Sequence, residues 1–304
     1  MDHDGWLAER FDEHRARLKA VAYRMLGSLS EADDAVQETW LRLNRTDSNS
    51  VQNLGGWLTT VLGRVCLDML RTRKSRREEP LGVHVPEPIV SHANGLDPEQ
   101  AALLADSVGL ALQVILDTLA PAERLAFVLH DMFGVPFDQI ALILGRSPNA
   151  ARLIASRARR EVRGAAKVPD ADLTSQREAV DAFFAASRRG DFDALVALLD
   201  PDVVVRADWG ALPAGVPGEL RGARAVAGQA LTFSRLSRFV QPVLVNGTAG
   251  AIVARHGRPI TVIGFTVRHG KIAEIDILAD PARLRELDLG VLDNRRTRHR
   301  VPTD

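Results

Sequence analysis

The chain has 304 residues, and its 39 lysines and arginines balance 39 aspartates and glutamates, so its formal net charge is zero. A hydrophobic content of 46% is ordinary for a globular protein of roughly two or three domains. No stretch approaches the ~20 apolar residues of a membrane span, and the charged N-terminus is unlike a signal peptide. The single cysteine, Cys66, excludes an internal disulfide, and no Cys/His cluster has zinc spacing. We therefore expect a cytoplasmic protein with no cofactor, metal or membrane partner.

The first quarter of the chain, from Trp6 to about Glu79, has the apolar spacing of helices. Gly27 ends a first helix, and Ser28 or Ser30 caps the second. A third helix is predicted over residues 57–76, after a polar loop at 44–56, and it ends in a basic run at 71–77. The predicted buried face of the second helix consists of Ala35, Val36, Thr39, Trp40 and Leu43.

A linker is predicted at residues 80–98, which hold four prolines and two glycines without periodicity. Helical spacing resumes at about Glu99, and from Pro121 onward the pattern is that of a DNA-reading helix-turn-helix. The short helix Phe137–Leu144 is followed by Gly145, which can supply a left-handed end. Ser147 and Pro148 then fix the start of the next helix. Its small, buried face is expected to be Ala151, Ala155, Ala158 and Val162.

The opposite face of that last helix is strongly cationic. Residues 145–167 contain seven lysines and arginines against one acid, Glu161. A concentrated cationic face neutralises phosphates, and Arg, Asn and Ser side chains can reach base edges in the major groove. The alternative is a solvated basic helix in an ordinary helical bundle.

The final third of the chain changes from helices to strands. After two amphipathic helices, residues rich in Val, Ile and Thr predict strands, and Asn-Gly and His-Gly pairs between them predict hairpin turns. This order predicts an α+β cone, a strand meander with helices on one face. The expected strands are residues 203–207, 239–245, 249–255, 260–268 and 272–278.

Together, these segments resemble the extracytoplasmic-function type of bacterial sigma-70 factors with a fused C-terminal SnoaL-like domain of the nuclear-transport-factor-two-like superfamily. The resemblance is carried by AYRMLGSLSEADDAVQETWLRL, GWLTTVLGRVCLDMLRTRKSRRE and the helix-turn-helix. It implies two all-α sigma domains, the second a helix-turn-helix, followed by the α+β cone. The predicted divisions are 1–79 (region 2-like), 80–98 (linker), 99–164 (region 4-like), 165–173 (linker), 174–290 (SnoaL-like) and 291–304 (basic tail).

The resemblance also implies a function: binding core RNA polymerase, through its β′ coiled coil and β flap, and directing it to promoter DNA. The residues implied to meet polymerase are Asp34, Gln37 and Glu38; Trp40, on the same segment, is better explained as core. Those implied at the −10 region are Arg64, Arg71, Arg73, Lys74, Arg76 and Arg77. Those implied at the −35 region are Ser147, Asn149, Ala150, Arg152, Leu153, Ser156, Arg157 and Arg159.

The role of the SnoaL-like domain has two competing interpretations. Relatives of this fold include enzymes, and the available polar or aromatic candidates are Asp208, Trp209, His256, His269 and Asp276, although no spacing shows that they converge. The favoured interpretation is regulation of the sigma domains, through two segments that resemble motifs of this class and an unidentified small-molecule ligand. These regulatory residues are Asp208, Trp209, Asp280, Pro281 and Leu284.

Two other functions remain open for the whole chain. A DNA-binding regulator that acts without polymerase would explain the helix-turn-helix but not residues 22–43 or the basic run. An enzyme of the SnoaL-like type, tethered to DNA by the helical half, is the third hypothesis.

Overall fold

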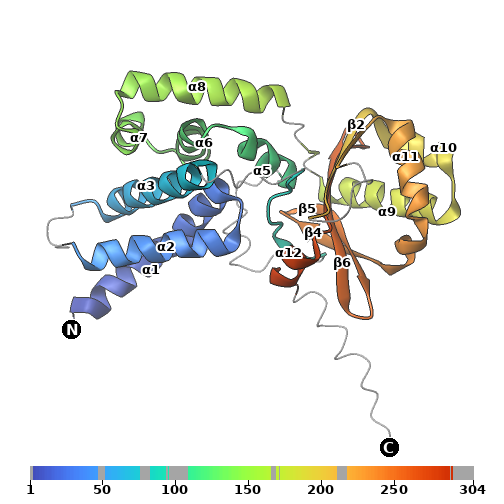
Figure 1. Cartoon of the computed structure of the whole chain (residues 1–304), viewed down its shortest axis with the longest axis horizontal. Coiled ribbons are helices and arrows are strands. Elements are labelled where there is room, and N and C mark those ends of the chain that lie inside the picture. Colours follow the sequence, from blue (N-terminus) through green and yellow to red (C-terminus); the bar gives the residue numbers. More distant parts are fainter. Residues whose placement is uncertain are drawn as a thin grey trace, which may run out of the picture. The chain divides into compact units, whose positions relative to one another are not determined.

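The computed structural model describes residues 3–46, 52–75, 83–93, 95, 109–165, 169–170, 172–210, 218–287 and 289. The chain divides into two compact units (Figure 1). Unit 1 comprises residues 1–79, 101–106 and 112–166, and unit 2 comprises residues 80–100, 107–111 and 167–304. The predicted sigma blocks therefore fall in unit 1, apart from residues 99–100 and 107–111, whereas the segment predicted as the first linker belongs to unit 2. The predicted domain boundaries themselves stay a prediction.

Three helices form the first half of unit 1: α1 (His3–Leu26), α2 (Leu29–Asn44) and α3 (Leu54–Ser75). Gly27 ends α1 at φ 75°, and the Ser28 side chain accepts from the Glu31 amide at 3.4 Å, as the sequence predicted. Helix α3 begins three residues before the predicted Trp57. The cause is Asn53, whose Oδ1 accepts from the Gly56 amide at 3.0 Å and caps the helix.

The second half of unit 1 contains the predicted helix-turn-helix. It consists of α5 (Gly109–Thr118), α6 (Pro121–Phe127), the π-helical turn η2 (Val128–Met132), α7 (Phe137–Leu144) and α8 (Pro148–Ala165). Gly145 adopts φ 62° after α7, and the Ser147 hydroxyl accepts from the Ala150 amide at 3.2 Å, so both predicted boundaries are confirmed. The predicted small face of α8 is buried throughout.

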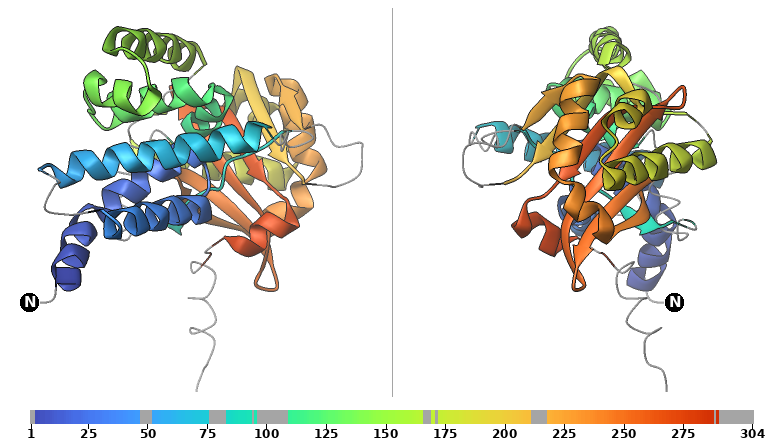
Figure 2. Two further views of the ribbon diagram at one scale, coloured as in Figure 1. Left: turned by 60° about the vertical axis from the view of Figure 1, so that its left-hand side comes forward. Right: turned by 90° about the vertical axis from the view of Figure 1, so that its right-hand side faces the viewer.

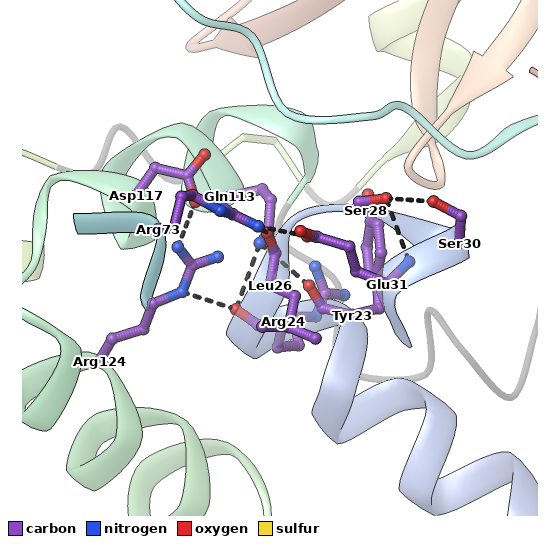
Figure 3. A network of polar contacts seen from close by, with 10 residues as sticks. All are labelled: Tyr23, Arg24, Leu26, Ser28, Ser30, Glu31, Arg73, Gln113, Asp117 and Arg124. Atoms are coloured by element: carbon purple, nitrogen blue, oxygen red, sulfur yellow. Dashed lines mark hydrogen bonds and ion pairs between the residues drawn. The ribbon is translucent and has the colours of Figure 1, made fainter. Parts of the chain in front are cut away.

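A buried polar network ties the two helical blocks of unit 1 together (Figure 3). The Gln113 amide donates to the carbonyls of Tyr23 and Arg24, both at 3.2 Å. The Arg124 guanidinium, 3% exposed, donates to the Arg24 carbonyl at 3.0 Å and pairs with Asp117. Burying a guanidinium is costly unless its donors are satisfied, so these bonds fix the end of α1 against α5 and α6.

Unit 2 is a mixed sheet with its main helical layer on one face (Figures 1 and 2). The strand order is β1-β4-β5-β6-β7-β2-β3, in which β4 to β7 form the predicted antiparallel meander and β2 lies parallel to β7. The strands are β1 (Val90–His92), β2 (Leu199–Asp208), β3 (Glu219–Arg221), β4 (Val240–Val245), β5 (Thr248–Arg255), β6 (Arg258–Arg268) and β7 (Lys271–Leu278).

The three hairpin turns form as predicted, because Asn246, His256 and His269 adopt φ values of 50°, 53° and 54° and each precedes a glycine with positive φ. Helices α9 (Leu173–Arg189), α10 (Phe192–Leu198) and α11 (Ala223–Thr232) contribute to the core on one face of the sheet, and the 3-10 helix η3 (Ser234–Phe239) follows α11. On the other face, α12 (Pro281–Glu286) and residues of the 83–90 segment share a second core.

Two of the observed strands, β1 and β3, were not predicted from the sequence. Strand β3 is only three residues long, and β1 lies inside the segment predicted as a plain linker. Val90, Ser91 and His92 pair antiparallel with Val245, Leu244 and Val243. Three residues carry too little periodicity to predict a strand, so this pairing depends on a sheet edge that lies about 150 residues later in the sequence. In the described ranges, no helix is long and apolar enough to cross a membrane.

Candidate nucleic-acid interface and linker contacts

The exposed face of α8 carries the residues predicted for the −35 element. Ser147, Asn149, Arg152, Leu153, Ser156 and Arg157 are all exposed, and Ala150 is half-buried. The Arg152 guanidinium donates to Asn149 Oδ1 at 3.0 Å and lies 5.6 Å from the centroid of the Phe137 ring. These two contacts hold Arg152 over the junction of α7 and α8 while leaving the side chain accessible.

Arg159 differs from the other cations of α8. Its side chain pairs with Asp131 of η2, with Nη2 at 2.6 Å from Oδ1, and is about one-third exposed. This ion pair holds α8 against η2, which gives Arg159 a structural role that the sequence did not indicate.

The apolar residues of the reading helix divide into two environments. Leu153 is 63% exposed, and Leu142 of α7 is 66% exposed. Ile154, by contrast, is half-buried. Leu153 is therefore on the accessible surface of the helix, where a leucine can meet a thymine methyl group, and Ile154 turns toward the core.

The cations predicted for the −10 region are only partly free on α3. Arg64, Arg71 and Lys74 are exposed, and Arg71 lies 3.7 Å from Asp68. Arg73 is half-buried: it pairs with Glu31 of α2 and donates to the Leu26 carbonyl at 3.4 Å (Figure 3). Arg76 and Arg77 lie outside the described residues.

Helix α3 also contacts the helix-turn-helix. Arg64 Nη2 donates to the Leu142 carbonyl at 3.3 Å. One residue earlier, Gly63 leaves room for Ile143, because an added Cβ would stand 3.0 Å from Ile143 Cδ1. A candidate −10 residue and the helix before the −35 reader are thus in direct contact within unit 1.

The predicted polymerase-facing residues lie on the outer side of α2. Asp34 and Gln37 are exposed, and Glu38 is half-buried and pairs with Arg42 at 2.9 Å. Trp40 is half-buried and packs on Phe11 of α1, with ring centroids 5.0 Å apart.

Asp208, at the end of β2, forms what we call the linker clasp with His84, Val85 and Arg283. Its Oδ2 accepts from the Val85 amide at 3.2 Å and from Arg283 Nη1 at 2.5 Å, and it lies 3.4 Å from His84 Nδ1. Burial by itself raises the pKa of this carboxyl, but the bonds from His84, Val85 and Gly210 and the charge of Arg283 outweigh it and hold the pKa at about 2.

The other predicted regulatory residues lie close to this clasp. Asp280 caps α12 by accepting from the Ala282 amide at 2.8 Å, Pro281 is the first residue of that helix, and Leu284 is buried. Trp209 follows Asp208 directly in the chain. His84, Val85 and Arg283 were not among the predicted regulatory residues, and nothing local in the sequence indicated that they share the Asp208 carboxylate.

The candidate acid–base residues do not form one site. His256 and His269 occupy hairpin turns. Asp276 pairs with Arg206 at 3.2 Å, and Arg206 also lies 3.4 Å from Glu274. Burial and, more weakly, the Glu274 charge raise the pKa of Asp276 to about 6 despite Arg206. The described residues contain no group of three or more His, Cys, Asp or Glu side chains that could hold a metal, and burial raises the pKa of the Cys66 thiol to about 12.

Comparison with known proteins identifies the helical half. Residues 10–76 match the family model "Sigma-70 region 2", and residues 109–162 match "Sigma-70, region 4". The ECF RNA polymerase sigma factor SigJ of Mycobacterium tuberculosis is 38% identical over 297 residues, covering 89% of this chain and 91% of SigJ. The probable ECF RNA polymerase sigma factor SigI of the same species is 32% identical over 283 residues, covering 90% of this chain and 93% of SigI.

The similarity extends to the whole fold. The crystal structure of M. tuberculosis SigJ superposes with a TM-score of 0.76 at 36% identity, covering 93% of this chain and 99% of SigJ. The sequence resemblance, the two sigma regions and the observed helical and α+β parts agree. The chain therefore belongs to the family of extracytoplasmic-function RNA polymerase sigma factors.

Proposed function

We propose that this chain binds core RNA polymerase, directs it to a specific promoter, and is regulated by its own C-terminal unit through the linker clasp. The first part is supported by the exposed face of α8 that carries the predicted −35 residues, which we call the reading face. This face belongs to a helix-turn-helix in the same chain as a region 2 block. Asp34, Gln37 and Glu38 are proposed to meet the β′ coiled coil, and the region 4 block the β flap.

Promoter reading requires the contact between α3 and α7 to open. Elements named for positions −35 and −10 lie about 25 base pairs apart, which is roughly 85 Å along B-form DNA. Helices joined by a 3.3 Å hydrogen bond from Arg64 to Leu142 do not span that distance. We infer that unit 1 as described is a closed form of the sigma blocks, and that Arg64 is released for DNA when they separate.

The linker clasp supplies a physical means of regulation. The connection from Ser75, the end of α3, to Gly109, the start of α5, is the stretch of chain that separates the two sigma blocks. Residues 83–92 of this connection are held by unit 2, through β1 pairing, the Ile89 amide bond to Asn246 at 2.9 Å and the Val85 bond to Asp208. Chain bound to the sheet does not extend, so we infer that the clasp favours the closed form and that its opening favours transcription.

Run-off transcription with purified core polymerase tests the proposal. We expect the full chain, or its clasp variant Arg283→Ala, to give discrete transcripts from some genomic fragments and none without polymerase. Arg157→Ala should reduce those transcripts while leaving binding to core polymerase intact, because it alters only the −35 contact. The absence of promoter-dependent transcripts from both proteins on every fragment would overturn the proposal and favour a DNA-binding regulator that acts without polymerase.

A further inference from the structure

Unit 2 contains an apolar pocket that no part of the proposed sigma activity uses. It lies between the helical layer of α9, α11 and η3 and the face of the sheet opposite the linker clasp, with a volume of about 170 Å³. The lining includes Phe183, Phe184, Trp209, Phe233 and Phe265. Cavities of about this size lined by apolar side chains exclude water and bind small aromatic molecules.

The chemistry of the lining excludes a charged ligand. None of the described residues that line the pocket carries an ionisable side chain. Burying a charge without a partner costs many kcal/mol, so a carboxylate or ammonium group has no compensation here. The acid–base candidate Asp276 is not part of this lining. It lies between the lining residues Ile275 and Ile277 along β7, so its side chain points to the other face of the sheet.

Most polar groups of the pocket already have partners. Ser187 Oγ donates to the Ala230 carbonyl at 3.3 Å, Ser237 Oγ to Ser234 at 2.6 Å, and Thr261 Oγ1 to Leu278 at 2.9 Å. Gln229, a further polar lining residue, is half-buried. Trp209 differs from these groups, because its indole Nε1 is buried and has no acceptor among the described residues. An indole N–H donates only, and leaving it unpaired in a buried site is unfavourable.

We propose that this pocket binds a neutral, largely apolar molecule of one or two rings, with a single hydrogen-bond acceptor that receives the Trp209 Nε1 proton. The volume of the pocket limits the size of the ligand, the apolar lining requires a ligand without charge, and the Trp209 N–H requires a hydrogen-bond acceptor on it. The Trp209 ring lies 6.2 Å from the Phe233 ring, centroid to centroid, so two neighbouring aromatic rings form part of the pocket wall. The described lining offers no acid or base, so we assign this site binding and no reaction.

Three two-ring probes of one skeleton test these features separately in the full chain. The probes are 1-tetralone, which has a carbonyl acceptor; tetralin, which has none; and tetralin-1-carboxylate, which is charged. Titration calorimetry should give 1-tetralone about fivefold tighter binding than tetralin, the value of one neutral hydrogen bond. The carboxylate should bind at least tenfold more weakly than the ketone.

Two variants locate the binding. Trp209→Phe keeps the ring but removes the donor, so the ketone and the hydrocarbon should bind equally well. Ala230→Trp, on the α11 wall of the pocket, should fill the volume and abolish binding, whereas Ala225→Trp, exposed on the same helix, should bind like the wild type. In nitrogen-labelled protein, the indole resonance lost in Trp209→Phe should shift with 1-tetralone and not with tetralin.

The outcomes separate cleanly. Equal binding of ketone and carboxylate, an unchanged ketone preference in Trp209→Phe, or saturable binding to folded Ala230→Trp each overturns the proposal. So does a lack of saturable 1-tetralone binding to the folded wild-type chain. None of these results depends on transcription, so the proposed ligand binding and the proposed sigma activity are tested independently.

Discussion

The reading face of α8 and the linker clasp are polar sites built in opposite ways. All the residues of the reading face come from one segment, 147–163, and most of their side chains face solvent. The clasp joins His84 and Val85 to Asp208 and Arg283, more than a hundred residues away, and its carboxylate is 8% exposed. The first site is ready to bind another molecule, whereas the second has bound part of its own chain.

Because the two sites are built differently, we expect mutations in them to have different effects. Changes on the reading face should alter DNA binding and leave the free energy of unfolding almost unchanged, since they remove few internal contacts. Changes in buried polar groups of unit 2 should alter stability or linker order and leave intrinsic DNA affinity unchanged. The following predictions test the comparison from the largest expected effect to the smallest.

The strongest expected effect is on the reading face. Arg152→Ala and Arg157→Ala should each weaken binding to the −35 element by about 1–3 kcal/mol if they read bases, because a bidentate arginine contact is of that size. Binding to a cognate and a scrambled duplex at fixed salt, together with a thermal melt, measures this. Arg160→Ala, exposed on the same helix, is the matched control. Equal losses on both duplexes would make the two arginines phosphate contacts instead.

The buried carboxylate Asp276 should control stability in a pH-dependent way. Its pKa of about 6 exceeds the ordinary value of about 3.9, so the folded state binds the proton more tightly. The resulting stabilisation is present below about pH 4 and is lost as the pH rises through 6. Asp276→Asn, which stays neutral, should therefore gain roughly 1–3 kcal/mol over the wild type between pH 4 and pH 8.

Chemical denaturation at the two pH values measures this gain, with Asp193→Asn, exposed on α10, as control. A constant difference between Asp276→Asn and the wild type across this range would show that Asp276 is ionised in the fold and that the Arg206 charge prevails over burial.

Loss of one clasp bond should loosen the linker without unfolding unit 2. Arg283→Ala removes one donor to Asp208, but the Val85 and Gly210 amides still donate to its carboxylate. We expect exchange of the Val85 amide with solvent to accelerate about tenfold, equivalent to the ~1.4 kcal/mol of one charge-assisted bond. Hydrogen exchange followed by mass spectrometry on the 83–90 segment measures it, and unchanged protection would mean that β1 pairing alone holds the linker.

The smallest expected effect is at Leu153. Because it is 63% exposed, Leu153→Ala should not lower the melting temperature. If the leucine meets a thymine methyl, affinity should fall by about 0.5–1 kcal/mol on a duplex with thymine and not on one with uracil at the same position. The same loss on both duplexes would assign Leu153 to nonspecific packing on the DNA.

Sequence was sufficient wherever neighbouring residues determine the structure. Gly145, Ser147 and Pro148 define the start of α8, and the alternation of small and basic residues defines its two faces; all are local, and all were predicted. The three hairpin turns were predictable for the same reason, since Asn-Gly and His-Gly pairs favour positive φ.

Sequence was insufficient wherever the partner lies far along the chain. Three residues of β1 gain their structure from β4, Arg73 is held by Glu31, and Arg159 is held by Asp131. The pocket is a further example: its residues are ordinary core residues one by one, and only the assembled sheet and helices leave the indole of Trp209 buried with no acceptor among the residues that the structure describes. Such features depend on contacts between residues far apart in the chain, which the hydrophobic periodicity of the sequence does not predict.

The central claim, that a sigma factor is held back by its own linker clasp, is tested most directly by comparing two neighbouring arginines in transcription. Arg283 bonds to Asp208, whereas Arg285 donates only to the Pro281 carbonyl of its own helix among the described contacts. At equal, subsaturating concentrations with core polymerase, Arg283→Ala should yield several-fold more promoter-specific run-off transcript than the wild type, and Arg285→Ala should equal the wild type. Equal transcript from all three proteins, or less from Arg283→Ala, would contradict the account.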